Sequence, residues 1–205
     1  MRDKHVNLII TGVGGQGILV LSRVIGEAAI KEGYQVKIAE VHGMAQRGGS
    51  LVTHVRIGKH VKSPLIPKFK ADMLISMEAM ESIRCLDYIK PKGYLIINKY
   101  ILVPADTSIS IKFEDLLTYL KSLEYRLIVL DAYRISSQLG ETRTTNMVVL
   151  GFLIGSNLLP ISKNSALKTI EATLPPRFKE VNFKAFNEGY KLGLGYRIEK
   201  NLSLY

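Results

Sequence analysis

Hydrophobic and polar positions along the chain follow two periods, one typical of buried strands and one typical of helices. Short apolar runs with β-branched residues predict strands at residues 6–11, 35–41, 50–57, 71–76, 94–98 and 126–131. Longer segments with apolar residues three and four positions apart predict helices at residues 16–31, 79–88, 113–122, 145–157, 162–174 and 183–192. Strands and helices that alternate in this way predict an α/β protein with three layers.

The segment after the second strand departs from this alternation. Strands 6–11 and 35–41, with the helix between them, form one βαβ unit, so these two strands should run parallel. Residues 42–50 then carry three glycines and no apolar periodicity, where a second crossover helix would be expected. The strand at 50–57 follows so closely that it predicts a hairpin arm. We therefore expect a single domain over residues 1–205, with a mostly parallel sheet, a hairpin arm and a helical C-terminal part.

Composition narrows the class of protein. The 205 residues are 47% hydrophobic and 22% charged, as in ordinary globular proteins. No apolar run reaches the roughly 18–20 residues of a membrane-spanning helix. The first residues lack the apolar region of a signal peptide, so we expect a cytoplasmic protein that does not contact the membrane.

Cysteine content and charge limit the chemistry further. The single cysteine, Cys85, excludes an intrachain disulfide and cannot by itself hold an iron–sulfur cluster or a cysteine-rich zinc site, so we expect a core residue. The net charge of +10 favours an anionic partner, which could be nucleic acid, a phosphate-bearing cofactor or an acidic protein face. Because lysine and arginine are spread along the whole chain, nucleic acid is disfavoured.

A glycine motif separates the first predicted strand from the first helix. It matches G-x-G-x-x-G and supplies five candidate binding residues: Gly12, Gly14, Gly15, Gln16 and Gly17. Such a turn lets a phosphate approach the backbone at a helix N-terminus. Glu40 follows Gly17 by 23 residues, where an acid would bind a ribose hydroxyl. The pattern is that of a Rossmann-like NAD or flavin site, or of a turn that only packs; the bulky Leu21 counts against a dinucleotide.

The loop after the second strand offers donors for an anion. Its candidate residues are His42, Gln46, Arg47, Gly48, Gly49 and Ser50. Arg47 presents a planar fork for phosphate or carboxylate, and the two glycines let backbone N–H groups turn toward an anion. Alternatively, Arg47 pairs with a carboxylate such as Glu40. His42 is a weak catalytic candidate, supported only by its ordinary pKa range.

Other polar residues have structural interpretations. Glu78 and Glu81 lie at the start of a helix, where we expect caps or solvated charges. Asn146 is either a cap of the helix at 145–157 or a ligand contact. The remaining histidines show no metal-ligand spacing, and we predict no metal site in this chain.

Three stretches together carry a family resemblance: residues 12–17, residues 40–50 (Glu-Val-His-Gly-Met-Ala-Gln-Arg-Gly-Gly-Ser) and residues 63–67 (Ser-Pro-Leu-Ile-Pro). On these the chain resembles the beta subunits of indolepyruvate:ferredoxin oxidoreductase and, more broadly, the gamma-type domain of the 2-oxoacid:ferredoxin oxidoreductases. The similarity is strongest over residues 7–98 and resumes at residues 145–151. The run at 42–50 is specific, whereas the glycine motif occurs in many unrelated folds.

The resemblance implies a complex that decarboxylates an aryl pyruvate on thiamine diphosphate, passes electrons through iron–sulfur clusters to ferredoxin and releases an acyl-coenzyme A. It implies that a larger alpha subunit holds the thiamine diphosphate, magnesium and clusters, because this chain has no Gly-Asp-Gly motif and one cysteine. Coenzyme A and the 2-oxoacid are then substrates. The alternatives are a free-standing NAD-dependent oxidoreductase using Glu40, a basic nucleic-acid-binding module, and a scaffold subunit.

Overall fold

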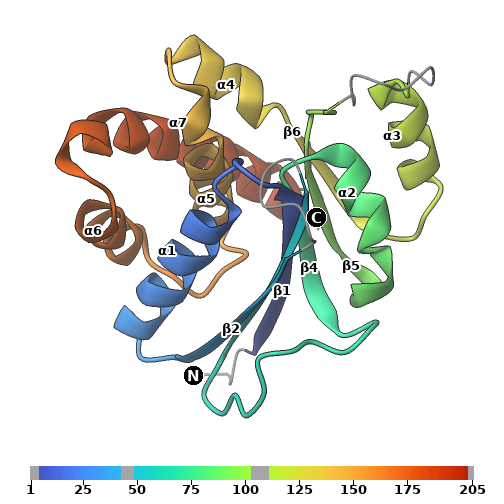
Figure 1. Cartoon of the computed structure of the whole chain (residues 1–205), viewed down its shortest axis with the longest axis horizontal. Helices are drawn as coiled ribbons and strands as arrows, with labels where there is room; N and C mark the ends of the chain where they lie inside the picture. Colours follow the sequence, from blue (N-terminus) through green and yellow to red (C-terminus); the bar gives the residue numbers. More distant parts are fainter. Residues whose placement is uncertain (1–4, 43–48, 103–110, 203–205) are drawn as a thin grey trace.

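The computed structural model describes residues 5–42, 49–102 and 111–202, and within these ranges the chain forms three layers (Figure 1). A central sheet is covered on one face by α1, α4, α5, α6 and α7 and on the other by α2 and α3. Each face of the sheet has its own apolar core, because alternate strand residues point to opposite faces. The predicted three-layer α/β class is confirmed.

Six strands of the described residues form one sheet in the order β2-β3-β1-β4-β5-β6. Their bounds are β1 Val6–Val13, β2 Gln35–His42, β3 Ser50–Gly58, β4 Ala71–Ser76, β5 Ile89–Asn98 and β6 Arg126–Leu130. Strands β1, β4, β5 and β6 pair in parallel. Strand β3 pairs antiparallel with both β1 and β2. The sheet is therefore mostly parallel, with an antiparallel part at the β2 edge.

The predicted hairpin is confirmed, and the structure adds its place in the sheet. Strands β2 and β3 form the hairpin, and β3 lies between β2 and β1. The residues between β2 and β3 are too few for a crossover, which needs about a dozen, so the chain returns antiparallel. Residues on both faces of β3, including His54 and Val55, are buried, as in an interior strand. Strands β1 and β2 run in the same direction, as predicted, but they are not neighbours.

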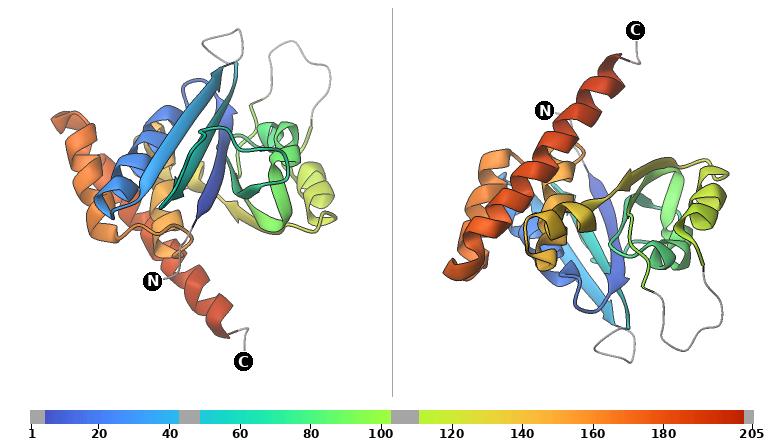
Figure 2. Two further views of the ribbon diagram at one scale, coloured as in Figure 1. Left: turned by 90° about the horizontal axis from the view of Figure 1, so that it is seen from below. Right: turned by 90° about the horizontal axis from the view of Figure 1, so that it is seen from above.

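The helices are α1 Ile18–Lys31, α2 Ala79–Arg84, α3 Phe113–Lys121, α4 Ala132–Gln138, α5 Thr145–Gly155, α6 Lys163–Thr173 and α7 Pro176–Leu202. Helix α7 begins at Pro176, well before the predicted 183. Proline suits the first position of a helix, because the N–H that it lacks would have no partner there. It runs diagonally across α5 and extends past the sheet (Figure 2). No helix in the described ranges has the length and apolar content to cross a membrane.

Helices α5 and α7 cross at four glycines. Every residue of α5 is buried. A Cβ atom on Gly151 would lie 2.0 Å from the carbonyl oxygen of Phe186, and one on Gly189 would lie 1.9 Å from that of Val148. Gly155 and Gly193 have similarly close backbone neighbours. The absence of side chains at these positions lets the two backbones touch, and this contact fixes where the N-terminus of α5 lies.

Candidate functional site

The candidate site lies at the carboxyl ends of the parallel strands. The chain leaves β1 toward α1 on one face of the sheet, and it leaves β4 toward α2 on the opposite face. A crevice forms where neighbouring parallel strands send their connections to opposite sides, and ligands of open α/β sheets bind there. The glycine motif predicted from the sequence sits at this crevice.

The glycine turn is shaped by its neighbours. Gly15 has φ +100° and Gly17 has φ +73°, both in the region that favours glycine. A Cβ on Gly17 would lie 2.4 Å from the side-chain nitrogen of Asn146, whereas a Cβ on Gly15 would meet nothing within 4 Å. Gly17 is thus needed for packing, and Gly15 is the position at which the turn is open.

The Gln16 side chain folds back onto the glycine turn. Its Oε1 accepts a hydrogen bond from the Val13 N–H at 2.9 Å, and its Nε2 lies 3.5 Å from the carbonyl oxygen of Met77. A Cβ on Gly12 would lie 2.5 Å from the same Oε1. The Met77 carbonyl also accepts from Asn98 Nδ2 at 3.1 Å. Gln16 is therefore engaged in joining the ends of β1 and β4.

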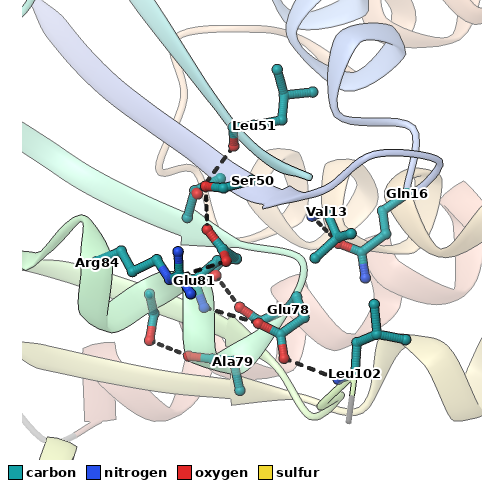
Figure 3. A network of polar contacts seen from close by, with 12 residues as sticks. Val13, Gln16, Ser50, Leu51, Glu78, Ala79, Glu81, Arg84 and Leu102 are labelled. Carbon is teal, nitrogen blue, oxygen red and sulfur yellow. Dashed lines mark hydrogen bonds and ion pairs between the residues drawn. The ribbon is translucent and has the colours of Figure 1, made fainter. Parts of the chain in front are cut away.

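Gly49 and Ser50, at the end of the loop between β2 and β3, form hydrogen bonds with the glycine turn and with α2. The Gly14 N–H donates to the carbonyl oxygen of Gly49 at 3.0 Å. The Ser50 hydroxyl donates to Glu81 Oε2 at 2.5 Å, and Arg84 Nε lies 3.4 Å from the other oxygen of Glu81 (Figure 3). The structure thus brings Gly14, Gly49 and Ser50 together at the start of α2.

Two buried carboxylates stand beside this junction. Glu78 caps α2 by accepting the Glu81 N–H at 2.9 Å, and it also accepts the Leu102 N–H at 3.0 Å (Figure 3). Burial raises the pKa of Glu78, against the opposing effect of these backbone hydrogen bonds. The capping role is confirmed for Glu78. The expectation of solvated charges is wrong, because both residues are less than 7% exposed.

Asn146 lies in the first turn of α5 and points toward α1. Its Nδ2 donates to the carbonyl oxygen of Gly17 at 3.1 Å, so it joins the two helix N-termini and does not cap its own helix. The capping interpretation is wrong, since the N-cap position belongs to Thr144. Asn146 is 4% exposed, and its Oδ1 has no hydrogen-bond partner among the described residues. A buried acceptor left in this way would gain from a donor.

Two cavities open on either side of Gly15. One, of about 150 Å³, reaches Tyr100 and Tyr133, whose rings are 4.8 Å apart. The other, of about 200 Å³, reaches Asn146 and Phe178. Both are lined by Gly15 and Arg143.

Arg143 stands between the two cavities. Its Nε and Nη2 donate to the two oxygens of Glu141 at 2.8 and 2.5 Å, and these bonds lower the pKa of Glu141 to about 2. Sequence reasoning missed Arg143; its place directly before the polar start of α5 was the available signal.

The structure does not gather all the predicted residues. Glu40 lies on β2 and lines a groove beside α1, with β3 between it and β1. In a dinucleotide fold the acid-bearing strand is next to the first strand, so this placement does not suit ribose binding. His42 is the last residue of β2. Gln46, Arg47 and Gly48 lie outside the described residues.

Metal and thiol chemistry have few candidates. The described residues contain no group of three or more His, Cys, Asp or Glu side chains placed to hold a metal ion. Cys85 is buried, and burial raises the pKa of its thiol, so its assignment to the core is confirmed.

Comparison with known proteins decides the family. The family model of pyruvate ferredoxin/flavodoxin oxidoreductases matches residues 7–192. The chain belongs to this family. Among its members, indolepyruvate oxidoreductase subunit IorB of Pyrococcus horikoshii is 36% identical over 92% of this chain and 96% of its own length. The IorB subunit of Archaeoglobus fulgidus is 35% identical over 94% of this chain and 98% of its own. The resemblance seen in the sequence is confirmed.

Solved structures of the family share the fold. The gamma subunit of a keto/oxoacid ferredoxin oxidoreductase from Geobacter sulfurreducens aligns with a TM-score of 0.72 at 23% identity, covering 93% of this chain and 99% of its own. The 2-oxoglutarate:ferredoxin oxidoreductase from Magnetococcus marinus gives the same TM-score over 95% of this chain but 32% of its own. In that relative the fold is one part of a longer polypeptide.

Proposed function

We propose that this chain is the small subunit of an indolepyruvate-type oxidoreductase of the cytoplasm. The complex converts an aryl 2-oxoacid, coenzyme A and oxidised ferredoxin into an acyl-coenzyme A, carbon dioxide and reduced ferredoxin. The observation that carries this proposal is the gradient of identity. IorB relatives are 34–36% identical, whereas the 2-oxoglutarate synthase subunit KorC of Methanothermobacter thermautotrophicus is 28% identical over a similar share of the chain.

The redox and thiamine cofactors belong, in this proposal, to a larger alpha subunit. Thiamine diphosphate supplies the carbanion chemistry of decarboxylation, and iron–sulfur clusters carry the electrons. Cluster ligation takes several cysteine thiolates, and Cys85 is the single cysteine of this sequence. This chain's donor set does not fit a cluster, so its contribution is binding and positioning.

The crevice is the part of this subunit that faces the alpha subunit. Gly15 leaves the backbone open, and the N–H groups at the start of α1 favour an anion. We propose that the glycine turn and residues 46–50 bind the phosphates of coenzyme A or support the thiamine pocket. The binding residues are then those of the turn, Gly49, Ser50 and Asn146, together with Arg47, which lies outside the described residues.

Co-expression with the candidate alpha subunit tests the function. The purified complex is assayed for reduction of ferredoxin with indolepyruvate, phenylpyruvate, pyruvate or 2-oxoglutarate, each with coenzyme A. We expect the aryl pyruvates to give the highest kcat/KM and omission of this chain to abolish turnover. A preference for pyruvate or 2-oxoglutarate would refute the substrate assignment.

Variants of the second loop test the role of the crevice. Arg47→Ala should raise the KM for coenzyme A or weaken assembly with the alpha subunit, and no change in either would contradict the proposal. The comparisons support this function and not the NAD-dependent alternative. Calorimetry of the chain with NAD should accordingly show no binding at micromolar concentrations.

A further inference from the structure

A second pocket lies at the opposite end of the sheet from the glycine turn. It has a volume of about 380 Å³ and is formed at the amino ends of β1, β4, β5 and β6. Its polar lining is His5, Asp72, Lys90, Lys92, Tyr94 and Arg126, and Val6, Met73 and Leu158 supply apolar surface. Pockets of this size hold small molecules. Because β1 spans eight residues, the pocket is about 25 Å from the crevice.

Tyr94 lies between two cations in this region. The Arg126 guanidinium is 5.2 Å from the Tyr94 ring centroid and the Lys200 ammonium is 4.9 Å from it. Both groups also donate to the phenol oxygen, Arg126 Nη1 from 3.2 Å. Since this oxygen already accepts two hydrogen bonds, its own O–H is directed elsewhere and can donate to an anion. The half-buried ring thus holds Arg126 from β6 beside Lys200 from the end of α7.

The pKa of the Tyr94 phenol is consistent with its two cationic neighbours. Burial by itself raises the pKa of Tyr94, but the hydrogen bonds and positive charges of Lys200 and Arg126 outweigh it and lower the pKa. The local field therefore favours negative charge.

Lys92 supplies a further cation at a backbone cost. It has φ +59°, a left-handed conformation that favours glycine over a residue with a Cβ. Lys92 lines the pocket and adds a positive charge to it that glycine, the conformationally favoured residue, would not supply. Strained residues of this kind concentrate at binding sites.

The acid of the pocket is already engaged. Asp72 accepts from Lys90 Nζ at 2.5 Å and from the Asn7 N–H at 2.8 Å. Within the described part of the chain, neither Lys92 nor Arg126 has a carboxylate partner. The pocket lining therefore keeps an excess of positive charge.

We propose that this pocket binds a small, multiply charged anion, a polyphosphate or polycarboxylate, at a site separate from the crevice. Arg126 and Lys92 bind its charged groups, and the Tyr94 hydroxyl donates to it. The apolar surface at Val6 and Leu158 contacts its carbon or uncharged part.

Isothermal titration calorimetry of the full chain, alone and in complex with the alpha subunit, tests the proposal. Inorganic pyrophosphate and citrate are the two probes, and they distinguish phosphate from carboxylate ligands. We expect at least one to bind, more weakly as salt rises. Arg126→Gln and Lys92→Gly should each weaken binding about tenfold, since each removes a charge-assisted contact. Lys121→Gln, which removes an exposed lysine on α3, is the matched control and should leave the affinity unchanged.

Lys92→Gly separates binding from folding. Glycine relieves the left-handed conformation, so this variant should be at least as stable as the parent while it loses affinity. Arg143→Gln, at the crevice, should not alter pyrophosphate binding at the proposed site. Absence of binding for both probes, binding that Lys92→Gly and Arg126→Gln leave intact, or binding lost in Arg143→Gln alone would overturn the proposal.

Discussion

Replacing Gly189 by alanine should force helices α5 and α7 apart. The new Cβ would lie 1.9 Å from the carbonyl oxygen of Val148, 2.7 Å from its carbonyl carbon and 3.0 Å from the Phe152 nitrogen. All three are backbone atoms of a helix, so none can rotate away as a side chain could. The contact can be relieved only by movement of one helix relative to the other.

The size of the effect follows from this geometry. Ordinary van der Waals contact begins at 3.4 Å, so the helices must separate by about 1.5 Å at this point. A gap of about 1 Å already forfeits up to half of each dispersion contact, and every residue of α5 is buried. The higher helix propensity of alanine relative to glycine offsets up to about 1 kcal/mol of this loss. We expect a net loss of about 3 kcal/mol in the free energy of unfolding.

The matched control is on the same helix. A Cβ on Gly195 would meet nothing within 4 Å, so Gly195→Ala should gain up to about 1 kcal/mol. Thermal melts followed by circular dichroism should show Tm lower by about 6–12 °C for Gly189→Ala and slightly higher for Gly195→Ala. Because α5 carries Asn146, Gly189→Ala should also disturb the contact at Gly17. A Gly189→Ala variant as stable as the parent would refute the close-contact reasoning.

Three further predictions concern buried polar groups. Burial lowers the pKa of His54, so the stability that the neutral imidazole provides is present above pH 6.5 and is lost as the pH falls below that value. Urea melts at a series of pH values should show this loss of stability, and the loss should be smaller in His54→Gln. Ser50→Ala should lower the free energy of unfolding by about 1–3 kcal/mol, because Glu81 loses a hydrogen-bond donor, and a second substitution, Glu81→Gln, should recover part of this loss. Additive effects of the two substitutions in a double-mutant cycle would exclude the interaction. The Cys85 thiol should resist iodoacetamide in the folded chain and react in urea, and rapid native labelling would contradict its burial.

Much of the fold could be predicted because it depends on local sequence. The period of apolar residues decides between strand and helix, and the strands at β3 and β4 begin where the sequence predicts. The ends of an element follow less closely from the sequence where the chain departs from a simple pattern. Strand β5 begins at Ile89, ahead of the predicted 94, because Ile89 already pairs with Ala71 of β4; the register then shifts before Tyr94, over the stretch that holds the left-handed Lys92.

The candidate site was only partly predictable. The glycine turn is a local device, in which neighbouring residues set the backbone path, and it was located from the motif alone. The identity of its contacts was not, because those residues come from separate elements. The sequence left Asn146 as either a cap or a ligand contact, and it did not single out Arg143, since neither position carries a local signal of its distant neighbours.

The sequence by itself determined the strands, most helices, the glycine turn and the family, because these depend on short-range sterics, apolar period and specific motifs. The tertiary structure decided that β3 separates β2 from β1, which moves Glu40 away from the glycine turn. It also decided that Asn146 meets Gly17, 129 positions away, and that Ser50 meets Glu81, 31 positions away. Such contacts arise from the packing of whole elements and, for Asn146, from the glycine crossing of α5 and α7, and no local pattern encodes them.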